Sequence, residues 1–426
     1  MNATRMIGYS LVLVVLLNAS GALADDWPQW RGPNRDGISK ETGLLKTWPK
    51  DGPKLVWQMK ELGGGYATPS VAAGRIYLMS NKGLEEESVK ALDENNGSQL
   101  WSTRIGKVGN PEQRPSYPAA RATPTVDGAL LYALGSDGDL VCLETSNGKL
   151  LWQKSLRTDF GGKPGKWAYS ESPLVDGDVV VCTPGGAEAT VIALNKKSGD
   201  AIWKTAIPEG DTAAYASVVV AEIGNVKQYV AFTANGLIGL DAKSGKFLWR
   251  YDATKGSNGM SILTPVSRDG LVYSGSKGVG GAAVKLSAEQ GTVKAEQIYI
   301  DTKLPSAIGG AVLVGDYLYG SGGQTLVCAD FKSGQVKWTD RSAAPGALCY
   351  ADGRLYLHGE DGEMALVEAT PEAYREHGRF TPPSPPARAN RMEKAWAYPV
   401  VANGRLYIRD TDSLWCYDVK QASAQR

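Results

Sequence analysis

The chain has 426 residues, including 51 glycines and two histidines, and its formal net charge at pH 7 is +1. A nearly neutral chain lacks the basic surface that nucleic-acid binding requires, so no nucleic-acid partner is expected. The scarcity of histidine, together with the lack of any Cys-x-x-Cys motif, argues against a zinc site. The abundance of glycine is typical of a chain with many tight turns.

Residues 1–24 have the pattern of a secretory signal peptide. Arg5 supplies a positive charge, residues 7–17 form an apolar core too short to span a bilayer, and Ala22-Leu23-Ala24 is a small-residue cleavage site. No cysteine stands directly after this site, which argues against a lipid anchor. We therefore expect export to the periplasm or the exterior, with no membrane span after cleavage. An uncleaved N-terminal anchor is the alternative.

Residues 25–52 are rich in Trp, Gly and Pro and show little hydrophobic periodicity. We expect an irregular N-terminal segment that packs on the rest of the protein through Trp27, Trp30 and Trp48, because indole rings are costly to expose. The alternative is an arm that binds a partner. Since this segment lies outside the repeat that follows it, truncation of Trp27 is predicted to cost less stability than truncation of a tryptophan in the repeat.

A hairpin pattern recurs along the remaining chain. In each complete copy an Asp, Asn or Glu is followed by Gly four residues later and by Trp eight residues later, as in Glu144, Gly148 and Trp152. The polar residue and the glycine suit a tight turn, and the tryptophan adds a large apolar group to the outgoing strand. The tryptophans that fit this position are Trp57, Trp101, Trp152, Trp203, Trp249 and Trp338.

A second hairpin precedes each copy, so that one unit has four short strands, A to D, and spans roughly 40 to 50 residues, as in a propeller blade. Eight units are counted from the starts of strand A, at Thr68, Thr123, Ser172, Ser217, Thr264, Gly310, Ala347 and Tyr398. The last unit has three strands, and residues 54–58 supply the missing one. We therefore predict an all-β, eight-bladed β-propeller over residues 53–421, a tail at 422–426, and a monomer.

Two units depart from the pattern. Ala295 in unit five and Pro382 in unit seven stand where the tryptophan is expected. The five cysteines do not suggest disulfides, because Cys142, Cys328 and Cys416 fall where other units carry Ala or Gly. We expect these three residues to be free thiols that serve as small buried groups on strand C.

The repeated phrase A-x-D-x-x-x-G-x-x-x-W resembles the pyrroloquinoline-quinone (PQQ)-like β-propeller repeat. The stretch 27–37 also looks like the start of exported bacterial members of that group. The resemblance implies that each strand-D tryptophan packs between neighbouring blades. The repeat serves both BamB-type scaffold proteins of outer-membrane assembly and quinoprotein dehydrogenases. The dehydrogenases carry a PQQ chamber, a calcium site, a catalytic Asp and a vicinal cysteine pair, and no catalytic residue of theirs can be matched to a position here.

We therefore expect an exported, non-catalytic propeller that binds an envelope protein or an extended polymer and needs no cofactor. The alternative is a PQQ-dependent quinoprotein oxidoreductase with PQQ and calcium. Acidic turns at 360–363 and 410–412 could hold calcium, although ordinary solvated turns are favoured. The proline-rich stretch 382–386 is interpreted as a stiff connector rather than a polyproline recognition site.

The connections between strands predict where a partner would bind. The D-to-A and B-to-C connections share one face, called here the loop face, and they vary in length and composition. The A-to-B and C-to-D turns share the opposite face, called the turn face, and they are short and uniform. Varied loops on a rigid scaffold usually carry binding. The candidate binding residues on the loop face are Tyr117, Arg121, Trp167, Tyr169, Tyr215, Arg391, Trp396 and Tyr398. The alternative is that these side chains only close the channel mouth.

Overall fold

The computed structural model describes residues 26–112, 119–208, 210–223, 226–289, 292–343, 345–388 and 393–422. The predicted signal peptide and two candidate binding residues, Tyr117 and Arg391, lie outside these ranges. Within them, no helix combines the length and the apolar character needed to cross a membrane.

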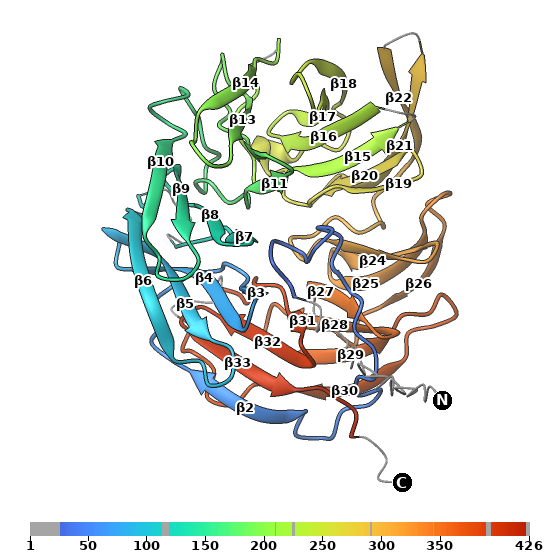
Figure 1. Cartoon of the computed structure of the whole chain (residues 1–426). Coiled ribbons are helices and arrows are strands. Elements are labelled where there is room, and N and C mark those ends of the chain that lie inside the picture. Colours follow the sequence, from blue (N-terminus) through green and yellow to red (C-terminus); the bar gives the residue numbers. More distant parts are fainter. Residues whose placement is uncertain are drawn as a thin grey trace, which may run out of the picture.

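Eight antiparallel sheets are arranged around a central channel, with strand A of each sheet innermost (Figure 1). This confirms the predicted eight-bladed, all-β propeller. The strands of each blade are given from the channel outward. Blade one has β3 (Ser70–Ala72), β4 (Arg75–Lys82), β5 (Glu86–Asp93) and β6 (Gln99–Gly106), and blade two has β7 (Thr125–Asp127), β8 (Leu130–Leu134), β9 (Asp139–Glu144) and β10 (Leu150–Ser155). Blade three has β11 (Leu174–Asp176), β12 (Val179–Cys182), β13 (Val191–Asn195) and β14 (Ala201–Thr205), and blade four has β15 (Val219–Ile223), β16 (Val226–Thr233), β17 (Gly236–Asp241) and β18 (Phe247–Tyr251).

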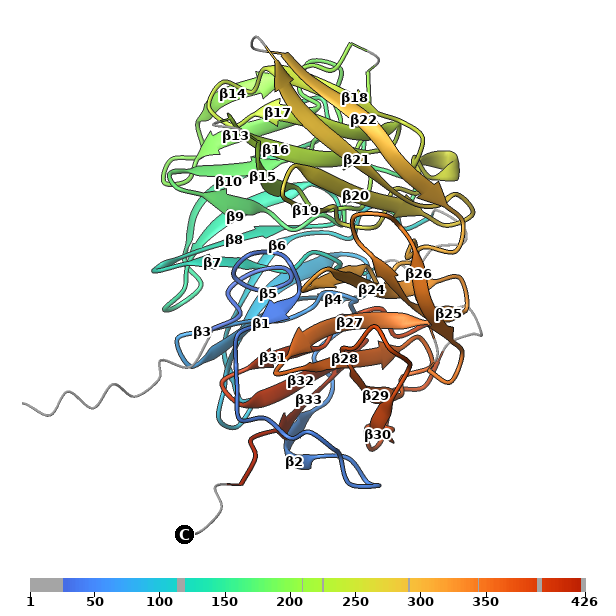
Figure 2. The same cartoon turned by 90° about the vertical axis from the view of Figure 1, so that its right-hand side faces the viewer.

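Blades five to eight follow in the same order around the ring. Blade five has β19 (Val266–Arg268), β20 (Leu271–Ser276), β21 (Gly280–Glu289) and β22 (Thr292–Asp301), and blade six has β23 (Ala311–Val314), β24 (Tyr317–Gly322), β25 (Thr325–Asp330) and β26 (Val336–Asp340). Blade seven has β27 (Gly346–Ala351), β28 (Arg354–Gly359), β29 (Met364–Glu368) and β30 (Glu376–Phe380), and blade eight has β31 (Val400–Ala402), β32 (Arg405–Asp410), β33 (Ser413–Asp418) and β2 (Lys54–Met59). A short strand, β1 (Ile38–Ser39), adds to blade seven in parallel with β27 (Figure 2).

The ring closes as the sequence predicted. Strand β2 pairs antiparallel with β33, and Trp57 lies opposite Cys416. The seam between blades eight and one is further tied by Arg409, whose buried guanidinium donates to the carbonyls of Ala67 at 3.0 Å and Met79 at 2.6 Å. Closure removes two sheet edges that would otherwise be open to pairing with other chains.

Each strand-D tryptophan stands opposite a small residue of strand C. The pairs are Trp101 with Ala91, Trp152 with Cys142, Trp203 with Ala193, Trp249 with Gly239 and Trp338 with Cys328. A β-bulge accompanies every one of these pairs, which bends the outer strand beside the ring. Small residues are required because the indole lies over them. All five cysteines are buried and free, as expected for the three on strand C.

Four of the blade tryptophans, Trp57, Trp101, Trp152 and Trp338, also donate a hydrogen bond to the next blade, in line with what the family resemblance implied. The indole N–H of Trp101 donates to the carbonyl of Thr145 at 3.1 Å, and that of Trp152 donates to Lys196 at 3.0 Å. The turn glycine that follows is packed against the same ring: a β-carbon on Gly148 would lie 2.5 Å from the indole of Trp101. The glycine and the tryptophan of the repeat meet in this way at the four interfaces from blades eight and one to blades three and four. Gly148 is therefore needed for contact as well as for its positive φ of 73°.

The assignment of Ala295 to the tryptophan position of blade five was wrong. The residue opposite Ala283 at the bulge is Tyr299, and its hydroxyl donates to the carbonyl of Phe331 in blade six at 2.7 Å. The hairpin of β21 and β22 is longer than in the other blades, with ten residues in each strand. The spacing of eight residues therefore pointed to a position too close to the turn.

The assignment of Pro382 in blade seven was wrong as well, because β30 ends at Phe380. The tryptophan of this blade comes instead from the N-terminal segment. Trp48 packs on Tyr356 with ring centroids 5.7 Å apart, and its backbone N–H donates to the carbonyl of His377 at 2.8 Å. In blades one, two, six and eight the strand-B tyrosine and the strand-D tryptophan are 6.0 to 6.2 Å apart. Trp48 thus occupies the equivalent place from a different part of the chain.

Candidate functional site

Hydroxyl side chains link neighbouring blades at the inner rim of the loop face. The backbone N–H of Thr123 donates to Ser172 Oγ at 2.9 Å, that of Ser172 donates to Ser217 Oγ at 2.9 Å, and that of Ser217 donates to Thr264 Oγ1 at 3.4 Å. The N–H of Tyr398 donates to Thr68 Oγ1 at 2.9 Å. The Ser or Thr at the start of strand A therefore holds the channel mouth in shape.

The N-terminal segment is docked in the middle of the ring. Residues 27–39, here called the plug, lie in the middle of the ring (Figure 1). Their contacts reach seven blades, in order from blade one to three and then from five to eight: Trp27 with Val71, Pro28 with Val126, Arg35 with Ser172, Trp30 with Thr264, Arg31 with Ala311, Gly37 with Tyr350, and Trp30 with Tyr398. Trp27 and Val71 exchange two backbone hydrogen bonds of 2.8 Å. Trp27 and Trp48 are buried and Trp30 is half-buried, so the described part of this segment is docked.

Two buried arginines make the plug electrostatically unusual. Burial lowers the pKa of Arg31, and it lowers the pKa of Arg35 to about 10. Arg35 donates to the carbonyls of Ser172 at 2.8 Å and Pro173 at 3.1 Å. Burial also raises the pKa of the nearby Glu171 to about 7, against the opposing effect of the hydrogen bond from Thr183 and the charge of Arg35. The plug is therefore held by polar contacts as well as by its tryptophans.

Aromatic and basic side chains gather at the channel mouth. Trp167 and Tyr215 have ring centroids 5.7 Å apart, and the backbone N–H of Trp167 donates to the Tyr215 hydroxyl at 3.1 Å. Trp396 packs on Tyr66 at 5.0 Å, and the guanidinium of Arg121 lies 5.5 Å from the centroid of the same tyrosine. These five residues, Tyr66, Arg121, Trp167, Tyr215 and Trp396, are called the mouth cluster. Each is half-buried, so each still presents surface.

Two expected binding residues have other surroundings. Tyr169 is 1% exposed in the core between blades two and three, and its hydroxyl donates to the carbonyl of Pro184 at 2.9 Å. Tyr398 is buried beneath Trp30, with ring centroids 4.5 Å apart, and its hydroxyl donates to the carbonyl of Ile308. Both rings pack internally, in line with the alternative that some of these side chains close the channel.

Tyr66 was missed, although the sequence held a signal for it. It lies two residues before Thr68 at the start of strand A, in the register that Arg121, Tyr215 and Trp396 occupy before Thr123, Ser217 and Tyr398. Tyr66 lies in the connection between β2 and β3, which was not among the varied connections that predicted the loop-face residues. The repeat register, applied to the loops, would have found it.

The acidic turns and the histidines are engaged in local contacts. Arg388 forms two hydrogen bonds of 2.6 and 2.7 Å with Asp410, and Arg379 pairs with Glu363 at 2.8 Å. His358 is buried against the carbonyl of Ala397, and burial lowers its pKa. His377 bonds Glu368 at 3.0 Å. Among the described residues, no three His, Cys, Asp or Glu side chains are grouped so that they could hold a metal ion.

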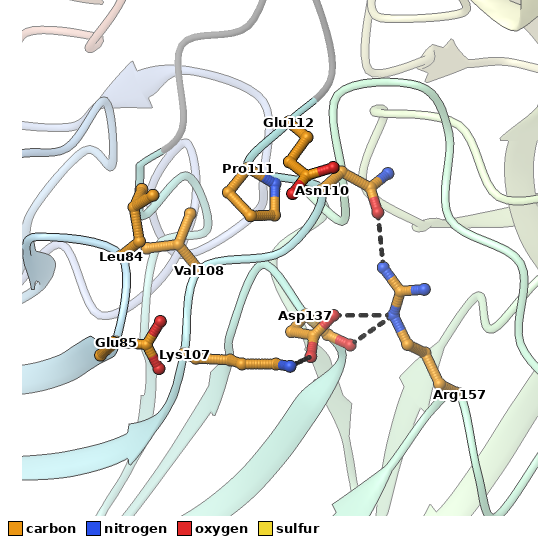
Figure 3. Close-up of a pocket in the computed structure, with 9 residues that line it drawn as sticks. All are labelled: Leu84, Glu85, Lys107, Val108, Asn110, Pro111, Glu112, Asp137 and Arg157. Atoms are coloured by element: carbon orange, nitrogen blue, oxygen red, sulfur yellow. Dashed lines mark hydrogen bonds and ion pairs between the residues drawn. The ribbon is translucent and has the colours of Figure 1, made fainter.

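A cavity of about 660 Å³ opens on the loop face between blades one and two (Figure 3). Its walls come from the B-to-C turns of both blades and from the connection between them, and Arg157 closes one side. Arg157 pairs with Asp137 at 2.9 Å and donates to Asn110 Oδ1 at 2.7 Å. Sequence reasoning did not identify this cavity, because its residues share no repeated position.

Comparison with known proteins gives two groups of relatives. Residues 85–340 and 284–372 match the family described as outer membrane protein assembly factor BamB. The BamB of Moranella endobia is 30% identical over 125 residues, covering 28% of this chain and 31% of that protein. The BamB of Burkholderia pseudomallei is 25% identical over 304 residues, covering 60% of this chain and 72% of that protein. The match spans about a third of the length of each of the first two relatives.

The second group consists of quinoproteins. The quinoprotein alcohol dehydrogenase PedH of Pseudomonas putida is 23% identical over 273 residues, covering 60% of this chain and 44% of that protein. Among solved structures, BamB from Moraxella catarrhalis aligns with a TM-score of 0.61 at 14% identity, over 86% of this chain and 99% of that one. Quinohemoprotein alcohol dehydrogenase from Comamonas testosteroni aligns with a TM-score of 0.52 at 13% identity, over 94% and 82%. These structural likenesses bear on the fold alone. Since the family match covers most of the chain, this protein belongs to the family of outer membrane protein assembly factor BamB.

Proposed function

We propose that the protein is an exported, non-catalytic propeller that binds a protein or another extended polymer across its loop face. The observation that carries this proposal is the pairing of a docked plug with an aromatic and basic mouth. The plug reaches strand A or the start of strand A in seven blades, so a ligand at the mouth would lie across the face instead of threading the ring. Trp, Tyr and Arg are the residues that dominate binding energy at interfaces.

The relatives support the scaffold role and suggest where the protein works. The family is named for outer-membrane assembly, and the sequence pattern of residues 1–24 predicts an export signal. We therefore extend the proposal to the periplasm and to a partner in the cell envelope. The partner would be recognised through exposed backbone and apolar or aromatic side chains, for which the mouth cluster offers stacking surfaces.

The experiment compares loop-face and turn-face variants in capture from the native envelope fraction. Trp167→Ala combined with Arg121→Gln removes two members of the mouth cluster while leaving the core residue Tyr169 intact. We expect this double variant to lose the specific partner at an unchanged melting temperature. The matched control is Lys149→Ala with Lys243→Ala, two exposed turn-face residues, which should capture normally. Loss of capture in the control and not in the mouth variant would refute the proposal.

The similarity to PedH supports a competing function, that of a PQQ-dependent oxidoreductase. The described residues do not fit that cofactor well. The middle of the channel holds Trp30 against Tyr398, and the five cysteines lie in five different blades, so no vicinal pair exists. We derive no reaction through PQQ. A visible-range spectrum of the purified protein with PQQ and calcium tests this alternative, and a stoichiometric bound-quinone spectrum would favour it over the scaffold role.

A further inference from the structure

The cavity between blades one and two is held open by hydrogen bonds among four separate loops. The N–H of Val108 donates to the carbonyl of Leu84 at 2.9 Å, and the N–H of Gly109 donates to Ser136 Oγ at 2.9 Å. A β-carbon on Gly109 would lie 2.3 Å from the carbonyl oxygen of Ser136, so the two loops are in close contact. Asn110, at the end of this wall, has a positive φ of 46°, which is uncommon for a residue other than glycine. The cavity is therefore a formed pocket with tied walls.

The charges that line the pocket do not balance. Asp137 is engaged by Arg157 at 2.9 Å and by Lys107 at 4.0 Å. Glu85 and Glu112 also line the pocket, and within the described parts of the chain neither carboxylate has an ion pair within 4 Å. Among the described residues that line the pocket, three carboxylates thus face two cations, and both cations already serve Asp137. The remaining negative charge favours a cationic occupant.

The same pocket has an apolar wall. Leu84, Val108 and Pro111 line it, and Leu84 is 43% exposed. In Figure 3 Leu84 and Val108 lie side by side, and the carboxylates of Glu85 and Glu112 stand at separate edges of the space. A long aliphatic side chain with a charged end matches this combination, because lysine and arginine bury their methylene stems while the charged group stays in a polar environment.

The pocket is continuous with the mouth cluster. The Asn110 side chain donates to the carbonyl of Gly165 at 3.1 Å, which ties the pocket wall to the loop that carries Trp167. Lys166 in that loop lies over the Trp167 ring at 5.5 Å. An extended chain lying on Trp167 and Tyr215 would therefore run toward the pocket, and one of its side chains could enter.

From this arrangement we infer that the pocket is a specificity site for a lysine or arginine side chain of an extended peptide bound across the loop face. The inference rests on the proposed function, because the peptide backbone would lie on the mouth cluster. It adds what that function lacks, namely a chemical preference: a basic residue beside an aromatic or apolar one, and discrimination against acidic segments at the same position.

The test measures binding of fluorescein-labelled, Ser- and Thr-rich peptides that carry a Phe and a central Lys, with Glu and norleucine versions as comparison. We expect the Lys peptide to bind at least about tenfold tighter than the Glu peptide, with a preference that weakens as salt is raised. Glu85→Gln with Glu112→Gln should reduce Lys-peptide affinity by about tenfold and leave norleucine-peptide affinity unchanged. The matched control is Glu372→Gln, an exposed glutamate on the turn face, which should bind like the unmodified protein.

Three results would overturn the inference. The first is equal affinity for the Lys and Glu peptides, or no binding of either. The second is an unchanged affinity of the Glu85→Gln with Glu112→Gln variant for the Lys peptide. The third is binding of spermidine alone as tightly as the Lys peptide, which would indicate a small-cation site. The failure of this inference is distinguishable from failure of the proposed function. If Trp167→Ala with Arg121→Gln abolishes partner capture while the Glu variant binds every peptide normally, the loop face binds its partner without this pocket.

Discussion

The blade tryptophans and the plug both hold neighbouring blades together, but they do so through different contacts. Trp152 lies between blades two and three, 9% exposed, and donates its indole N–H to the next blade. Trp27 lies at the channel, 2% exposed, and exchanges backbone hydrogen bonds with Val71. Trp152 can be identified in the sequence from the repeated spacing, whereas Trp27 belongs to no repeat. A residue outside the repeat is therefore buried at least as deeply as a tryptophan of the repeat.

The largest expected effect tests this equivalence. Trp152→Ala should lower the free energy of unfolding by ~3–5 kcal/mol, the usual loss for a buried aromatic side chain. The sequence alone predicted a smaller loss for Trp27→Ala. The burial of Trp27 and its contact with Gly32 now predict a loss of the same size. Urea unfolding of the two variants measures both values. If Trp27→Ala lowered the free energy of unfolding by well under half as much as Trp152→Ala, the plug would not be part of the folded core.

A somewhat smaller effect is expected at the blade that borrows its tryptophan. Trp48→Ala should cost ~3 kcal/mol, because it removes the ring that packs on Tyr356 and Phe380. Trp338→Ala in blade six is the matched control for a tryptophan supplied within its own blade. Thermal unfolding that shows no loss for Trp48→Ala would contradict its assignment as the missing blade-seven residue.

The buried carboxyl group of Glu87 predicts that the free energy of unfolding depends on pH, in a way that an exposed glutamate would not produce. Burial raises the pKa of Glu87 to about 7 although Ser136 donates two hydrogen bonds to it. A raised folded-state pKa means that the folded protein favours the proton, so this contribution is complete below the unfolded pKa of ~4.3 and is lost as the pH rises through 7. Relative to Glu87→Gln, the unmodified protein should lose up to ~1.4 kcal/mol per pH unit across that window.

Urea unfolding at several pH values between 5 and 8 measures this difference. Exposed Glu372→Gln is the control and should give a difference that does not change with pH. A stability gain for the unmodified protein over Glu87→Gln as the pH rises would reverse the sign and contradict the account.

The smallest effect is expected on strand C. Cys328→Ala should cost ~1 kcal/mol or less, since alanine is the residue that other blades carry opposite the same tryptophan and leaves only a small void. Mass spectrometry of the unmodified protein should show Cys142, Cys328 and Cys416 as free thiols. Any of the three in a disulfide would contradict the packing described.

The sequence predicted the parts of the structure that repeat. Six tryptophans, their small partners and the closing strand all followed from one hairpin phrase, because a propeller blade needs the same turn and the same interface each time. Ala295 was assigned to the position that Tyr299 occupies, because a longer hairpin shifts the register without changing the turn chemistry. The contact of Trp48 with blade seven was not predicted, since no local pattern in residues 25–52 encodes contacts with residues some 300 positions away.

The site was predicted in outline only. The loop face and four of its residues, Arg121, Trp167, Tyr215 and Trp396, were named from loop length and composition. Tyr169 and Tyr398 were named by the same reasoning, yet they are buried, because composition does not reveal which way a ring turns. Tyr117 and Arg391 stay predictions. The pocket near Glu85 needed three-dimensional information, since its walls come from four loops with no common spacing.

The central claim is that the plug is part of the folded propeller, and native-state hydrogen exchange tests it most directly. The amides of Trp27 and Val71 hydrogen-bond each other's carbonyls, so both are protected only while the plug is docked. We predict that they exchange with an opening free energy within ~1 kcal/mol of the slowest amides in β9, as expected for one cooperative unit. Exchange of Trp27 and Val71 through openings several kcal/mol smaller, with β9 still protected, would show an arm that leaves the channel on its own.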